Sequence, residues 1–110
     1  MEIEKLIVMT VNDITYFLLK KGAHIITSEI VALERDFHIL IEANIKVTVD
    51  ILKSIEAMKK AKDHPELKYY SSLSESIGNL QGIYDIAPFL SKVDFESSED
   101  ELKIELFVKK

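Results

Sequence analysis

The chain has 110 residues, of which 47% are hydrophobic and 30% charged, and this balance predicts one soluble globular domain over residues 1–110 rather than a disordered chain. Its 14 basic and 19 acidic residues give a net charge of −5, which argues against nucleic-acid binding because that needs cations to displace counterions from phosphates. Cysteine is absent, which excludes disulfides, thiol nucleophiles and cysteine-based zinc sites.

The N-terminal segment predicts an amphipathic helix that ends before Gly22, a residue suited to the left-handed position after a helix. The first residues are acidic, unlike a signal peptide, and the apolar run from Leu6 to Met9 is too short to span a bilayer. We therefore expect a cytoplasmic protein without membrane contact. The apolar residues of the helix recur at i, i+3, i+4 and i+7: Ile3, Leu6, Ile7, Val11, Ile14, Phe17 and Leu18.

Two alternating segments, residues 24–34 and 37–47, predict a β-hairpin that turns at residues 34–37. If Glu34 and Phe37 flank a two-residue turn, Glu29 lies opposite Glu42. We interpret these two carboxylates as solvated groups that splay apart, with a metal or proton site as the alternative. The face expected to meet the helix contains small and apolar residues: Ile26, Ser28, Ile30 and Ala32 with Ile39, Ile41, Ala43 and Ile45.

The opposite face of this hairpin is partly apolar. Scattered exposed apolar residues are normal, but four on one sheet face are also typical of a subunit or partner contact. The residues of this candidate interface are Ile25, Val31, Leu33 and Leu40.

A second helix is predicted after residue 47, with Thr48 or Asp50 as its cap and Pro65 forcing it to stop near His64. The stretch from Tyr69 to Ile86 keeps a loose helical period, which predicts two short helices or one broken helix.

Alternation returns in residues 92–97 and 101–108 and predicts a closing hairpin. The whole pattern gives the element order α-β-β-α-α-β-β. It indicates an α+β fold, a two-layer sandwich with helices packed on one face of a mainly antiparallel sheet.

The sequence lacks the common catalytic and ligand-binding motifs. It has no HxH or HExxH spacing, no G-x-S-x-G nucleophile elbow, no G-x-G-x-x-G and no Walker A motif. Only three glycines occur, too few for a backbone loop that wraps a polyphosphate. We assign no catalytic residue, no metal site and no cofactor.

The element order, residues 82–86 and residues 89–97 (Phe-Leu-Ser-Lys-Val-Asp-Phe-Glu-Ser) resemble the GHKL ATPase domain of histidine kinases, gyrase-type proteins and anti-sigma-factor kinases. Residues 64–70 (His-Pro-Glu-Leu-Lys-Tyr-Tyr) also resemble a segment of small uncharacterised bacterial proteins with this layout. The resemblance implies a nucleotide pocket made by the first helix, the second strand and a late glycine.

That pocket would be degenerate in this chain. With Gly22 as anchor, Asp13 stands at the position of the family's catalytic glutamate and Phe17 at that of its magnesium-binding asparagine, where a phenyl ring cannot ligate a hard cation. Asn44 falls within the run that replaces D-x-G-x-G, and only Gly82 is left of the later G-x-G.

These observations favour a noncatalytic regulatory or protein-interaction module on an ATPase-like scaffold, with a protein partner or a homodimer through the outer sheet face. The alternative is a small-molecule binder, with a nucleotide as one candidate ligand, whose pocket has changed. Acid–base catalysis by Asp13 or by the Glu29 and Glu42 pair is a third reading, but no nucleophile, base and electrophile are placed together.

Overall fold

The computed structural model describes residues 2–63 and 85–110 and shows an α+β fold. The described residues follow the order α-β-β-α-β-β, whereas the predicted order has one more helix. That helical stretch, Tyr69 to Ile86, lies almost entirely outside the described residues. The elements are α1 (Ile3–Lys20), β1 (Ile25–Ala32), β2 (Asp36–Asn44), α2 (Val49–Asp63), the 3₁₀ helix η3 (Ala87–Phe89), β3 (Leu90–Ser97) and β4 (Glu101–Lys109).

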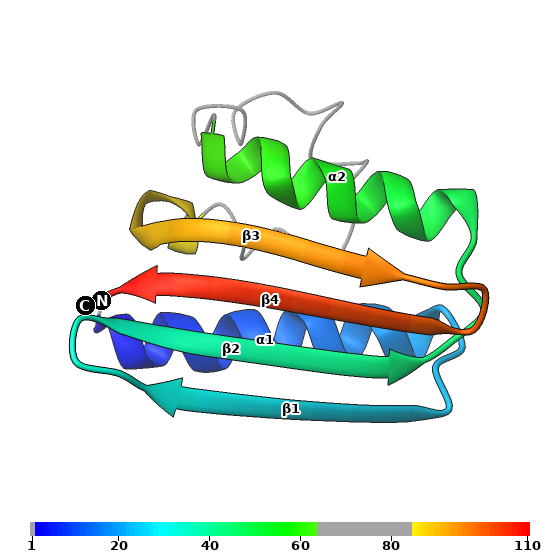
Figure 1. The fold of residues 1–110 in the computed structure, drawn as a ribbon, viewed down its shortest axis with the longest axis horizontal. Helices are drawn as coiled ribbons and strands as arrows, with labels where there is room; N and C mark the ends of the chain where they lie inside the picture. Colours follow the sequence, from blue (N-terminus) through cyan, green and yellow to red (C-terminus); the bar gives the residue numbers. More distant parts are fainter. Residues whose placement is uncertain (1, 64–84) are drawn as a thin grey trace.

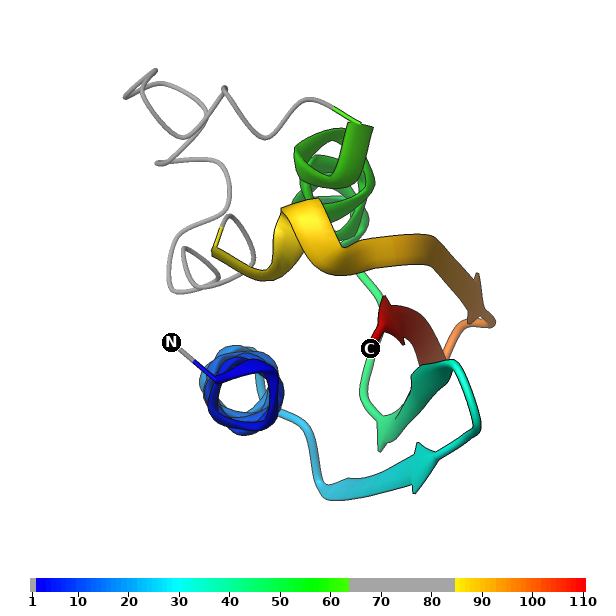
Figure 2. The same ribbon diagram turned by 90° about the vertical axis from the view of Figure 1, so that its left-hand side faces the viewer.

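The four strands form one antiparallel sheet in the order β1-β2-β4-β3. Both α-helices lie on the same side of this sheet, and α2 runs beside β3 (Figures 1 and 2). β4 along its whole length, and β2 from Ile39 onward, alternate between buried and more exposed residues, because one face meets the helices and the other does not. On the helix side they bury Ile39, Ile41, Ala43, Leu102, Ile104, Leu106 and Val108.

The predicted strands and their faces are confirmed for the first hairpin, but the predicted register is wrong by two residues. Glu34 and Arg35 occupy the turn, since the Leu33 amide donates to the Asp36 carbonyl at 2.8 Å. Glu29 therefore pairs with Leu40 rather than with Glu42. A shift of two keeps every side chain on its predicted face, so the apolar pattern fits both registers equally.

The edge strand β1 is less covered than predicted. Its helix-side residues were expected in the core, but Ser28, Ile30 and Ala32 are exposed, and Ile26 is only partly buried. The helix side of β2 is therefore covered as predicted, whereas the helix side of β1 is covered only in part.

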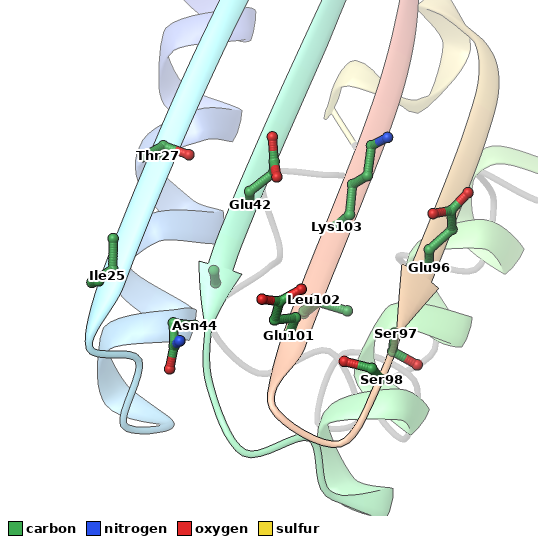
Figure 3. Close-up of a pocket in the computed structure, with 11 residues that line it drawn as sticks. Ile25, Thr27, Glu42, Asn44, Glu96, Ser97, Ser98, Glu101, Leu102 and Lys103 are labelled. Carbon is green, nitrogen blue, oxygen red and sulfur yellow. The ribbon is translucent and has the colours of Figure 1, made fainter.

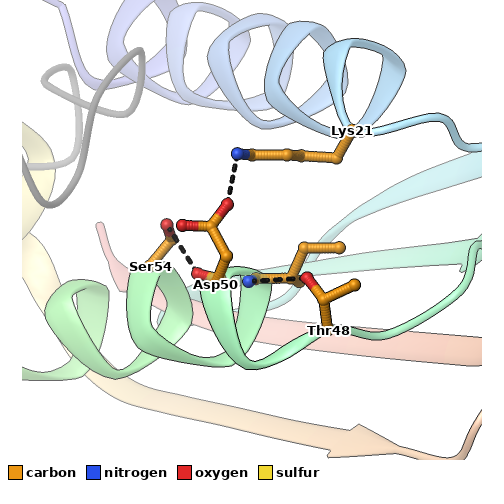
Figure 4. Close-up of polar contacts among 5 residues, drawn as sticks. Lys21, Thr48, Asp50 and Ser54 are labelled. Carbon is orange, nitrogen blue, oxygen red and sulfur yellow. Dashed lines mark hydrogen bonds and ion pairs between the residues drawn. The ribbon is translucent and has the colours of Figure 1, made fainter.

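The adjacent ends of α1 and α2 are tied together by polar contacts (Figure 4). The Lys21 ammonium pairs with the Asp50 carboxylate at the start of α2. Thr48 caps that helix by accepting a hydrogen bond from the Ile51 amide at 3.3 Å. Gly22 has φ 97°, so it supplies the left-handed turn that sends the chain from α1 into β1. Neither described helix is long and apolar enough to cross a membrane.

Candidate functional site

The sheet face opposite the helices is covered by no helix of the described residues (Figure 2). Strand pairing arranges its outward side chains in rows that cross the sheet from β1 to β3. Starting beside the β1–β2 turn, the rows are Val31, His38, Phe107 and Lys92; Glu29, Leu40, Glu105 and Asp94; Thr27, Glu42, Lys103 and Glu96; and Ile25, Asn44 and Glu101. We call these residues the open face.

The open face is acidic. A further row pairs Asp36 with Lys109, and because these two charges are opposite, this row does not change the net charge of the surface. Because these groups lie on one exposed surface, their combined field attracts cations and repels phosphates. The open face carries six carboxylates (Glu29, Glu42, Asp94, Glu96, Glu101 and Glu105) against two lysines (Lys92 and Lys103).

A cluster of interacting side chains lies on the two central strands of the open face. The His38 ring stacks on Phe107 with ring centroids 4.6 Å apart, and its Nε2 lies 3.0 Å from Glu105 Oε2. Lys103 Nζ lies 3.4 Å from the other oxygen of the same carboxylate. The hydrogen bond with His38, assisted by Lys103 and opposed by partial burial, holds the pKa of Glu105 below its usual 4.5.

A hollow of about 430 Å³ occupies the end of the open face farthest from the β1–β2 turn (Figure 3). Carboxylates from three strands line it, namely Glu42, Glu96 and Glu101. None of these three forms an ion pair with another described residue, whereas Glu105 and Asp94 each have a lysine partner. The hollow therefore presents carboxylates free to accept hydrogen bonds from a ligand. Its other polar side chains are Thr27, Asn44, Ser97, Ser98 and Lys103.

The four residues of the candidate interface predicted from sequence do not all lie together in the structure. Val31 and Leu40 lie diagonally across neighbouring strands of the open face, and Leu33, 44% exposed, lies just before the turn. Ile25 is 63% exposed but lies at the other end of β1, where it lines the hollow. The four residues are therefore an apolar end of the open face plus one separate side chain.

The residues of the predicted vestigial nucleotide pocket are not gathered at one place. Phe17 is buried in the core between α1 and the sheet, and Asp13 lies nearby on the same helix. Asn44 lines the hollow on the opposite face of the sheet. Gly82 lies outside the described residues.

Sequence reasoning missed the pairing of β2 with β4. This pairing sets His38 against Phe107 and Glu42 against Lys103. The alternating polar residues of the last strand predicted that one of its faces points outward, but nothing in the sequence identified which strand pairs with that last strand. No group of three or more histidine, aspartate or glutamate side chains suited to a metal ion occurs in the parts of the chain described.

Comparisons with protein-family models, with curated proteins and with solved structures find no match for this chain.

Proposed function

We propose that this protein is a noncatalytic interaction module, on the ATPase-like scaffold that its element order suggests, and that its open face binds a basic segment of a protein partner. The excess of carboxylates around an open hollow carries the proposal. Lysine or arginine side chains entering the hollow would meet Glu42, Glu96 and Glu101, which have no competing ion pairs with described residues.

The same charge argues against a homodimer through this face. Two copies packed face to face would bring two acidic surfaces together, and like-charge juxtaposition costs several kcal/mol at an interface. A cationic partner instead gains from the same field, both in encounter rate and in specificity.

The apolar end of the open face indicates that the partner carries apolar side chains as well as basic ones. Leu40 lies one row from the hollow, and Val31 and the ring of Phe107 lie two rows from it, on the same surface. A segment that combines basic and apolar side chains would contact both ends. A polyphosphate would contact neither favourably, which places a nucleotide ligand second to a basic peptide.

A peptide of alternating lysine and valine residues is a direct probe. We expect amide chemical-shift changes at open-face residues, with affinity that falls as salt is raised. The double reversal E42K/E96K should weaken binding at least about tenfold, equivalent to about 1.4 kcal/mol. The double reversal E4K/E56K is the matched control, because it makes the same change in net charge on α1 and α2.

Equal loss of binding in both double variants would mean that net charge alone attracts the peptide, and the proposed site would be wrong. A parallel thermal-shift titration with ATP, with and without magnesium, tests the nucleotide alternative. A ligand at a hundred times its dissociation constant stabilises a protein by about 2.7 kcal/mol, so a clear rise in melting temperature would favour that alternative.

A further inference from the structure

The two edges of the sheet are built differently. The β3 edge has an irregular register between Leu90 and Lys92, alternates charged residues along its length and lies beside α2 (Figure 1). The β1 edge has none of these features. It pairs with β2 without a bulge, contains neither proline nor lysine, and carries one charge, Glu29. Natural edge strands usually carry such features because an unprotected edge pairs with another strand.

The backbone groups of β1 that bond to no described strand belong to alternate residues. The Leu33 amide bonds to the Asp36 carbonyl, so the hydrogen-bonded pairs of the β1–β2 ladder are the odd residues of β1. The N–H and C=O groups of Ile26, Ser28 and Ile30 therefore point away from β2. These groups form a row of donors and acceptors that a second strand can complete.

The polarity of the residues along β1 is symmetric about Ser28. Two apolar residues, 25 and 26, precede three polar residues, 27–29, and two more apolar residues, 30 and 31, follow. An antiparallel copy paired with Ser28 opposite Ser28 matches apolar with apolar and polar with polar throughout. It also places each Glu29 opposite Thr27 of the other copy instead of opposite a second carboxylate.

We propose that β1 pairs with β1 of a second copy of this chain, antiparallel and centred on Ser28, to form a two-fold symmetric dimer with a continuous eight-stranded sheet. The pairs of Ile26 with Ile30, and of Ser28 with itself, supply about six interchain hydrogen bonds. The two-fold axis of such a dimer is perpendicular to the sheet, so both copies of α1, which covers one side of the sheet in each chain (Figure 2), lie on the same side of the extended sheet.

This dimer is independent of the proposed function, because it uses the strand edge and leaves the open face accessible. Light scattering during size-exclusion chromatography should give twice the 12.6 kDa mass of the chain. A Ser28→Pro substitution should give the monomer mass, because proline removes the central edge N–H and places its ring in the contact. That N–H is not part of the β1–β2 ladder, so the fold should survive, as circular dichroism can verify. Ser28→Ala is the matched control and should stay dimeric.

Cross-linking tests the register without relying on a disruptive variant. The chain has no cysteine, so Ser28→Cys introduces a single thiol that meets its own copy across the two-fold axis and should oxidise to a covalent dimer. Ala32→Cys is exposed on the same side of the same strand but lies far from its copy, and should not cross-link.

A wild-type mass of one chain would overturn the proposal. A dimer that persists in the Ser28→Pro variant, or cross-links equally through residues 28 and 32, would also overturn it. The charge reversals E42K/E96K should leave the dimer mass unchanged, so loss of peptide binding and loss of dimerisation are separate outcomes.

Discussion

The register of the first hairpin can be tested with an engineered disulfide. In the structure Thr27 lies opposite Glu42, so T27C/E42C places two cysteines on directly paired residues. Opposed residues on antiparallel strands have Cα atoms about 4.5–5.5 Å apart, within the range that a disulfide spans. Glu29 and Glu42 are instead diagonal neighbours about 7–8 Å apart, so E29C/E42C should oxidise poorly.

The stabilisation follows from the loop that the bridge closes. A cross-link from residue 27 to residue 42 closes about 15 residues, which the chain-entropy model values at about 3 kcal/mol before any strain is subtracted. A domain of this size has an unfolding entropy near the melting temperature of about 0.23 kcal/mol/K, so the rise in melting temperature should reach roughly 10 °C. Reducing agent should remove it.

Thermal unfolding with and without reductant gives the change in melting temperature of both double variants, and mass spectrometry shows whether the intrachain disulfide has formed. If E29C/E42C bridges readily and T27C/E42C does not, Arg35 and Asp36 occupy the turn. The rows of the open face would then shift by two residues on β1, and the arrangement around the hollow would need to be rebuilt.

Three further predictions concern stability. Gly22→Ala should lower the free energy of unfolding by about 1 kcal/mol, because alanine is strained at φ 97° even though its Cβ would meet no atom within 4 Å. Gly22→Asn should lower it less, because asparagine tolerates this conformation better. Equal losses for the two variants in chemical denaturation would contradict this reasoning. Because the pKa of Glu105 is lowered, its contribution is present above pH 4.5 and is lost as pH falls through the lowered value. E105Q should therefore flatten the pH dependence of the free energy of unfolding below about pH 4.5. The change should be less than about 1 kcal/mol because the pair with His38 is partly exposed, and a curve parallel to wild type would refute this. Ile41→Ala, in a fully buried position, should cost about 2–5 kcal/mol in urea unfolding, whereas Ile25→Ala should cost under about 0.5 kcal/mol.

Local periodicity in the sequence predicted most of the described elements. The first helix, predicted to end before Gly22, ends at Lys20, and Thr48, one of the two predicted caps, accepts a hydrogen bond from the amide of Ile51. The alternation of the closing hairpin placed its strands within two residues of their observed ends. These features depend on near neighbours in the chain, which is why they can be inferred from sequence.

The candidate site was harder to predict because it depends on contacts between distant segments. The turn after Leu33 lacks an Asn-Gly or Asp-Gly signal, and its apolar pattern fits two registers that differ by two residues. The neighbours of Glu42 are Thr27 on one side and Lys103 on the other, and the second comes from the opposite end of the chain. No local pattern indicates that β4 inserts between β2 and β3.

The difference between the two sheet edges limits how far strand pairing can extend. A chain with two unprotected edges could add copies indefinitely and grow into a fibre. Here the irregular register at Leu90 and Lys92, and the helix beside β3, leave the outer edges of a β1-paired dimer unsuited to further addition. Strand addition through β1 would therefore stop at two subunits, because such a dimer would present only its two β3 edges.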